Sequence, residues 1–85
     1  MKLFHSLLLT LLLFFSSSAF AEKININTAT AEQISSVMTG VGESKAKAIV
    51  DYRRTHGNFN SIEALENVDG IGEKTVEKNR DKLTL

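Results

Sequence analysis

The 85-residue sequence contains no cysteine and no proline, and ten basic residues balance ten acidic ones to give no net charge at pH 7. The missing cysteines exclude disulfides and thiolate metal sites, although small secreted domains often depend on disulfides. The balanced charge excludes a protein that attracts nucleic acid through a large positive field. Helix packing must therefore supply the stability, and any binding of anions must depend on a few locally placed groups.

Residues 1–21 have the pattern of a secretory signal peptide. Lys2 precedes an apolar run from Leu7 to Phe15, and small residues lead to Ala19-Phe20-Ala21, an A-x-A cleavage pattern. An uncleaved membrane anchor is the alternative, which the shortness of the run disfavours. Cleavage after Ala21 predicts an exported protein, periplasmic or otherwise extracytoplasmic, with no membrane span left. The remaining domain, residues 22–85, is small and, without Lys2, has a net charge of about −1.

A glycine pattern occurs twice in this domain. Gly40-Val41-Gly42 and Gly70-Ile71-Gly72 are each followed by glutamate and by a helix-forming stretch. Two glycines around one aliphatic residue, at the start of a helix, form a tight turn whose amides can hold a phosphate. A single G-x-G is more often a structural turn, but the second copy with matching flanks favours a protein that binds a polyanion at two points.

Helical spacing predicts one pair of helices around each glycine turn. Thr30 and Gln33 form a capping box that predicts a helix beginning at Ala31, and a second helix is expected from about Glu43 to Arg54. A short third helix and a fourth that begins near Glu73 surround the second turn. We expect an all-α domain in which the two pairs pack around a pseudo-two-fold axis, so that both turns emerge on one surface.

Three further expectations concern positions outside the turns. Phe59, in the connector between the pairs, is expected to anchor in the core, and Asn60 and Ser61 are alternative caps for the third helix. Asn79 falls on the inward face of the fourth helix, an unusual place for an amide. A short pairing of residues 24–26 with residues 83–85 is an open alternative, because both segments alternate apolar and polar residues.

Together these residues resemble the helix-hairpin-helix domain of ComEA-type competence proteins. The resemblance covers residues 24–85 and rests on five segments in the family's order: Ile24–Glu32, Gly40–Ala46, Tyr52-Arg53, Gly57–Phe59 and Gly70–Gly72. It implies a tandem helix-hairpin-helix fold that binds double-stranded DNA through its backbone phosphates without reading sequence. It also implies a role in DNA uptake during transformation, with proteins of the uptake machinery as further partners.

The family's phosphate-binding positions can be carried over residue by residue. They correspond to Gly40, Gly42, Ser44 and Lys45 in the first hairpin, and to Gly70, Gly72, Lys74 and Thr75 in the second. The sequence departs from the family at Thr39 and Asp69, where relatives often have proline, and at Asn79, where they commonly have an aliphatic residue. Because Asp69 places a negative charge beside the second turn, the first hairpin is expected to be the better phosphate site.

Other functions find less support in the sequence. His56 is the only histidine after Ala21 and has no partner at metal-ligand spacing, so neither a metal nor another cofactor is expected. No catalytic set of side chains is recognisable, which disfavours a minimal exported nuclease and predicts a protein that is not an enzyme. The main alternative is a helix-hairpin-helix module that binds proteins and not DNA, favoured by the neutral charge and by Glu43, Asp69 and Glu73 near the turns.

Overall fold

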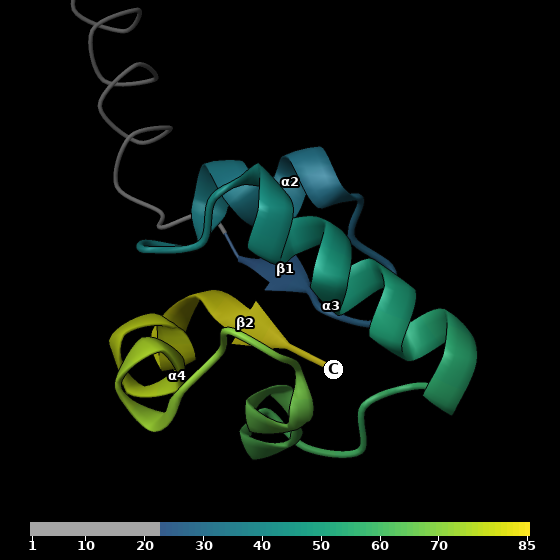
Figure 1. Cartoon of the computed structure of the whole chain (residues 1–85). Helices are drawn as coiled ribbons and strands as arrows, with labels where there is room; N and C mark the ends of the chain where they lie inside the picture. The colour runs from purple at the N-terminus through teal and green to yellow at the C-terminus, as the bar shows by residue number, and fades with distance from the viewer. Residues whose placement is uncertain (1–22) are drawn as a thin grey trace, which may run out of the picture.

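The computed structural model describes residues 23–85, so the signal peptide predicted for residues 1–21 lies outside the described residues. Within this range the chain is mostly helical. Its elements, in chain order, are β1 (Ile24–Asn25), α2 (Ala31–Val37), α3 (Glu43–His56), the 3-10 helix η1 (Glu63–Asn67), α4 (Glu73–Asn79), the 3-10 helix η2 (Arg80–Lys82) and β2 (Leu83–Thr84). Figure 1 shows α2 and α3 in one layer, and η1 and α4 in a second layer beneath it.

Helix α2 begins at the predicted capping box. The Gln33 backbone N–H donates to Thr30 Oγ1 at 3.1 Å, and the Thr30 N–H donates to Gln33 Oε1 at 3.0 Å. Each side chain thereby satisfies an amide that the first helical turn leaves without a partner. The helix turns Ile34 fully inward and ends at the first glycine turn.

Helix α3 is the longest described element and lies with α2 in the first layer. It buries Ala46, Ile49 and Val50, as the helical spacing predicts. It ends at Gly57, whose φ of +91° is costly for any residue with a Cβ atom. The helix continues to His56, beyond the predicted end at Arg54, so the prediction of a loop at Thr55 and His56 was wrong.

Phe59, in the connector between the two layers, is held by Asn27 and Tyr52. The backbone of Phe59 donates to Asn27 Oδ1 at 2.7 Å and accepts from Asn27 Nδ2 at 3.1 Å, while its ring lies 4 % exposed. The Tyr52 ring stacks on it with centroids 5.4 Å apart. The predicted core role of Phe59 is confirmed. Neither of the two alternative caps is the N-cap of η1, which is Ile62 and has no side-chain cap, although the Ser61 hydroxyl accepts from the Ala64 N–H at 3.2 Å.

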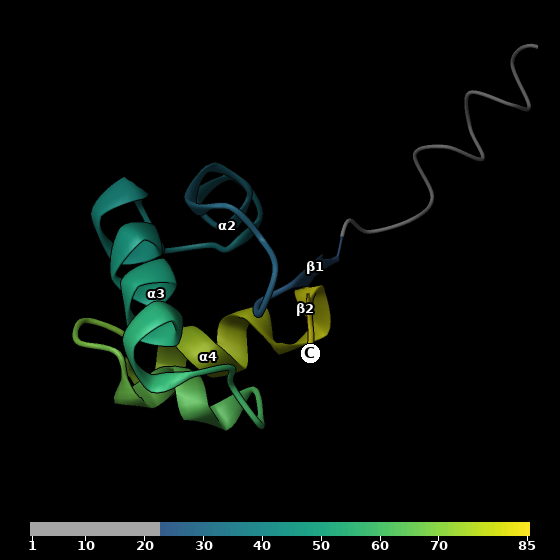
Figure 2. The same ribbon diagram turned by 90° about the vertical axis from the view of Figure 1, so that its right-hand side faces the viewer.

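The two ends of the described chain form a parallel pair of two-residue strands. Ile24 lies opposite Leu83 and Asn25 opposite Thr84, and the Ile26 N–H donates to the Thr84 carbonyl at 3.0 Å. Figure 2 shows β1 and β2 side by side, to the right of the helices. The pairing that the sequence left open therefore exists, and it adds a small sheet to the expected all-helical fold.

One hydrophobic core joins the layers. Its most deeply buried apolar side chains come from both halves of the chain: Ile26, Ile34, Ala46, Ile49, Leu65 and Val76 are 0 % exposed. Neither pair of helices can bury its apolar face alone, so packing of one pair on the other holds the two glycine turns in a defined relative position. Among residues 23–85, no helix has the length and apolar character needed to cross a bilayer.

Candidate nucleic-acid interface

The first glycine turn connects α2 to α3. Gly40 has a φ of +79°, and Gly42, at the N-cap of α3, is extended with φ −79° and ψ −174°. Between them Val41 is buried at 3 % exposure and ties the turn to the core, while both glycines stay exposed. No side chain caps the N-terminus of α3, so its first amides have no protein acceptor from a cap. Free amides at the start of a helix suit an anion.

The second glycine turn repeats this geometry between η1 and α4. Gly70 has a φ of +91°, Gly72 is extended with φ −106° and ψ 176°, and Ile71 is buried at 4 % exposure. Again no side chain caps the helix that follows. The close agreement between the two turns follows from their matching sequences, because a positive φ is needed at the first glycine of each.

The side chain of Lys45, a residue beside the first glycine turn, lies next to Gly70 in the second. Lys45 belongs to the first turn of α3, yet its side chain lies across the second glycine turn. A Cβ atom at Gly70 would lie 3.5 Å from Lys45 Cε, 3.6 Å from Cγ and 3.8 Å from Cδ. The apolar stem of the lysine therefore covers a glycine that belongs to the other hairpin, and its ammonium group is held near the second turn.

The remaining predicted side chains belong to the first turns of α3 and α4. Ser44 and Lys74 are exposed and Thr75 is half-buried. Neither Lys45 nor Lys74 forms an ion pair with a described residue, in contrast to Lys47, which lies 3.6 Å from the Glu43 carboxylate. Both lysines beside the turns are therefore available to an external anion.

A third lysine, which the sequence did not reveal, lies beside the first turn. Lys82 comes from η2, near the end of the chain, and its Nζ donates to Thr39 Oγ1 at 2.8 Å and to the Val37 carbonyl at 3.4 Å. The partners of these contacts are separated by 43 and 45 positions in the sequence. No local pattern indicates them, because they depend on how η2 packs beside the end of α2.

Asn79 also reaches the first turn from the second layer. Its Oδ1 accepts from the Thr39 N–H at 2.7 Å, and its Nδ2 donates to the Thr39 carbonyl at 2.9 Å. The expectation that Asn79 faces inward is confirmed, since it is 0 % exposed. Two of the departures from the family pattern, Thr39 and Asn79, are thus the two partners of one contact.

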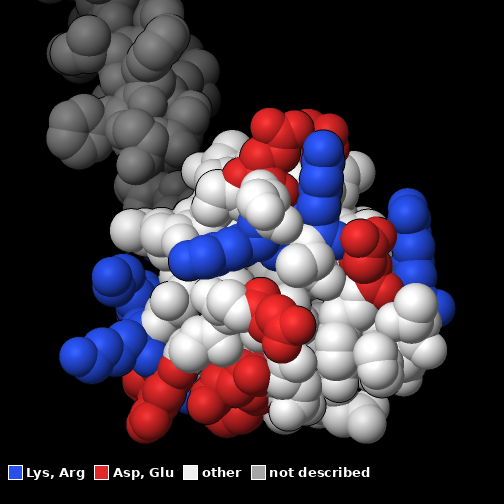
Figure 3. Space-filling model, in the orientation of Figure 1, with Lys and Arg blue, Asp and Glu red and all other residues white. Residues whose placement is uncertain are grey.

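Acidic side chains interrupt the positive charge around the turns. Glu43, Asp69 and Glu73 are all exposed, and each adjoins one of the glycine motifs in sequence. Figure 3 shows blue and red side chains interleaved on the face that carries α3, without a continuous positive patch. Electrostatic attraction on this face is therefore local, as the balanced composition predicts.

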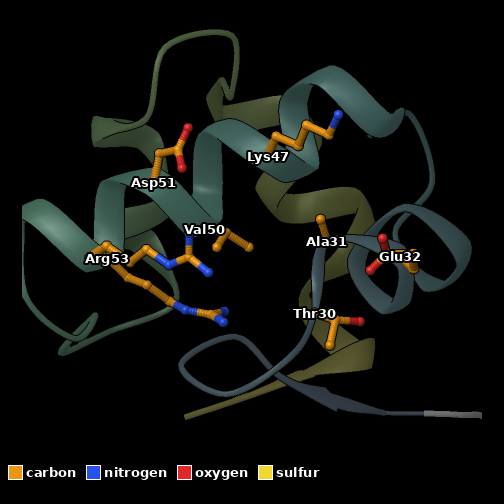
Figure 4. A pocket seen from close by; sticks show the side chains of 8 residues that line it. Thr30, Ala31, Glu32, Lys47, Val50, Asp51 and Arg53 are labelled. Atoms are coloured by element: carbon orange, nitrogen blue, oxygen red, sulfur yellow. The ribbon is translucent and has the colours of Figure 1, made fainter.

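A polar groove lies away from the predicted residues, between α3 and the start of α2. It has a volume of about 460 Å³ and is lined by Thr30, Ala31, Glu32, Lys47, Val50, Asp51, Arg53 and Arg54 (Figure 4). Arg53 Nη1 donates to the Ile26 carbonyl at 2.9 Å, and burial followed by the charge of Arg54 lowers the pKa of this guanidinium. Arg53 thus secures the end of α3 to the N-terminal segment. In residues 23–85, no group of three or more His, Cys, Asp or Glu side chains could hold a metal ion.

Two helix–glycine turn–helix units that share one core define a helix-hairpin-helix module. The family model for the helix-hairpin-helix motif matches residues 19–84. ComE operon protein 1 of Bacillus subtilis is 48 % identical over 62 residues, which cover 73 % of this chain and 30 % of that protein. The chain therefore belongs to the ComEA-type helix-hairpin-helix family.

The same module occurs in proteins of different length. An uncharacterized protein of Haemophilus influenzae is 56 % identical over 63 residues, which cover 74 % of this chain and 56 % of the relative. The endonuclease/exonuclease/phosphatase family domain-containing protein 1 of Mus musculus is 46 % identical over 61 residues, or 72 % of this chain and 10 % of the relative. The aligned region is thus about half of the Haemophilus protein and a small part of the murine one.

Proposed function

We propose that the chain binds double-stranded DNA through its backbone phosphates, without reading sequence. The observation that carries the proposal is the convergence of two uncapped glycine turns, with the Lys45 stem lying across Gly70. Each turn offers backbone amides to one phosphate, and Lys45, Lys74 and Lys82 add charge. Contacts of this kind fix position on a duplex and carry no base information, so affinity is expected to be modest and dependent on salt.

Gly42 and Gly72 allow a test in which binding is separated from folding. Both have extended backbones that any residue adopts, and a Cβ atom at either position meets no atom within 4 Å. Both glycines are N-cap residues, where glycine is preferred over leucine, so leucine at these positions should cost about 1 kcal/mol and leave the fold intact while keeping a phosphate away from the amides. We expect Gly42→Leu and Gly72→Leu each to weaken binding of the purified chain to an arbitrary duplex, measured by fluorescence anisotropy.

The anisotropy titration is made at two salt concentrations, and it is repeated with a single strand in place of the duplex. Binding that is present at low salt and falls as salt rises supports phosphate contacts. No binding at low salt, or binding that both leucine variants leave unchanged, refutes the proposal. A single strand of the same length reports whether the two turns require phosphates on the spacing of a duplex.

We further propose that the two hairpins are related by a pseudo-two-fold axis and act in DNA uptake outside the cytoplasmic membrane. The repetition of the glycine turn with matching flanks supports the symmetry, and similarity to ComE operon protein 1 supports the role. Export rests on the signal pattern of residues 1–21. Its test is the intact mass of the chain recovered from a bacterial host, which should correspond to residues 22–85; a mass that retains residues 1–21 contradicts cleavage.

The second candidate is a module that binds proteins through the same scaffold, and the exposed Asp69, Glu43 and Glu73 beside the turns favour it. Lys45→Glu and Lys74→Glu distinguish the two candidates. Loss of duplex binding supports the DNA-binding function, whereas loss of a protein partner with unchanged DNA retention supports the alternative. We propose no enzymatic activity, and cleavage of duplex DNA by the purified chain with magnesium would overturn that proposal.

A further inference from the structure

Asn79 is the only polar residue that is fully buried within residues 23–85. All the hydrogen-bonding groups of its amide are used: Oδ1 accepts from the Thr39 N–H, and Nδ2 donates to the carbonyls of Thr39 and of Thr75, the latter at 2.8 Å. Burying an amide is costly unless its hydrogen bonds are made. The complete pairing at this site therefore makes the position of Thr39 strongly dependent on Asn79.

The contact joins the helix of the second hairpin to the turn of the first. Asn79 ends α4, which begins at the second glycine turn, and Thr39 immediately precedes Gly40 in the first. When the two glycine turns are aligned, Asn79 corresponds to Ile49, an apolar residue in α3. Within the described residues, no side chain makes a hydrogen bond to the backbone of Asp69, which precedes Gly70. Only the first turn is held in this way.

We propose that Asn79 is a positioning residue for the first phosphate-binding hairpin. By fixing the N–H and the carbonyl of Thr39, it holds the following turn in the conformation that receives a phosphate, so that little order is lost on binding. Asn79 cannot contact DNA itself, because it is 0 % exposed. The inference rests on the proposed DNA-binding function and makes the first hairpin the better prepared of the two.

The first test compares two variants in α4. Asn79→Leu keeps the size of the side chain and removes its hydrogen bonds, whereas Val76→Ala opens a cavity at another fully buried position of the same helix without touching Thr39. Both variants lose stability, so anisotropy titrations are made where circular dichroism shows each to be folded. We expect Asn79→Leu to bind a duplex about tenfold more weakly, the loss of roughly one charged hydrogen bond, and Val76→Ala to bind as the wild type does.

A second variant addresses the contact from its other side. Thr39→Pro removes the N–H that donates to Asn79 Oδ1, and the extended Met38, with φ −80° and ψ 123°, suits a residue before proline. The substitution also removes the hydroxyl that accepts from Lys82, a loss that the single and the double variant share, so that it cancels when the two are compared. Thr39→Pro leaves Asn79 Oδ1 without its donor, and Asn79→Leu leaves both the N–H and the carbonyl of Thr39 without a side-chain partner. The double variant Thr39→Pro/Asn79→Leu removes both members of the N–H···Oδ1 pair and leaves the carbonyl of residue 39 without its donor. We expect the affinity loss of the double variant to be smaller than the product of the two single losses. If the affinity loss of the double variant equals the product of the two single losses, Thr39 and Asn79 act independently and the proposed coupling between them is wrong.

Amide hydrogen exchange gives a readout that does not depend on DNA. Asn79→Leu should speed exchange at Thr39 to Gly42 more than at Asp69 to Gly72, whereas Val76→Ala should not produce this difference. Equal changes at both turns, or equal affinities of Asn79→Leu and Val76→Ala, overturn the inference and leave the proposed function standing. Failure of the wild-type chain to bind any duplex refutes the proposed function instead, and exchange still decides whether Asn79 holds the turn.

Discussion

Neutralising Lys45 should reduce the salt dependence of DNA binding by the share of one phosphate contact. Three lysines lie beside the turns, namely Lys45, Lys74 and Lys82, and each neutralised phosphate adds about 0.9 to the slope of log K against log salt. Between 50 and 200 mM salt, three contacts correspond to a loss of affinity of roughly 40-fold, and two contacts to roughly 12-fold. We therefore expect Lys45→Met to reduce the loss across this interval by about 3.5-fold.

Methionine is chosen because the apolar stem of Lys45 covers Gly70, and a thioether chain preserves that packing. Lys47→Met is the matched control. Lys47 lies two positions further along the same helix, about 200° around its axis, and is paired with Glu43. Lys47→Met should therefore leave the slope of log K against log salt nearly unchanged, and Lys45→Arg should keep the wild-type slope.

The measurement is a series of anisotropy titrations with one arbitrary duplex, repeated with a duplex of unrelated sequence. Loss of a contact to phosphate weakens binding to both duplexes by the same factor, because the phosphates are the same in every sequence. If Lys47→Met lowers the slope as much as Lys45→Met does, the charge acts only through the general field of the domain, and the reasoning from the position of Lys45 is wrong. A slope that neither variant changes refutes a phosphate contact at Lys45 altogether.

Three further predictions concern stability and ionisation. Gly40→Ala should lower the free energy of unfolding by about 1–2 kcal/mol in urea denaturation, because φ is +79° and nothing crowds the added Cβ atom, whereas Gly42→Ala should cost less. Leu65→Ala should cost about 2–5 kcal/mol by the same assay, since Leu65 is 0 % exposed; a smaller loss would contradict close packing of η1. Hydrogen bonding and charge from Arg80 lower the pKa of Glu63, so the favourable interaction is present above the ordinary carboxyl pKa and lost as pH falls through the lowered value; Arg80→Gln should raise the Glu63 midpoint in an NMR titration.

The local features of the fold were predictable because their causes lie within a few residues. The capping box at Thr30 and Gln33 involves neighbours three positions apart, and it is present as predicted. The positive φ at Gly40 and Gly70 follows from the need for a reversal that only glycine adopts cheaply. Where prediction was wrong, at Thr55 and His56, the polar run was read as a loop, although the helix continues until Gly57 allows it to end.

The contacts between layers could not be predicted in the same way. Spacing placed Asn79 inward, but nothing in the sequence indicated that its partner is the backbone of Thr39, in the other hairpin. Lys82 was not selected because it lies far from both glycine motifs in sequence, and only the packing of η2 brings its ammonium group to Thr39 Oγ1. Long-range hydrogen bonds of this kind leave no periodic signal.

The sequence by itself determined that this protein has two equivalent glycine turns, four helical segments and an apolar face on each pair, because propensity, capping and periodicity act locally. The sequence also placed Asp69 beside the second turn alone, but only the tertiary structure decided which side chains of the other pair reach each turn. Packing one pair on the other lays Lys45 across Gly70 and places Asn79 and Lys82 against Thr39. The physical reason is that the shared core fixes both pairs in one orientation, so that residues far apart in the chain hold the first turn while the second remains beside Asp69.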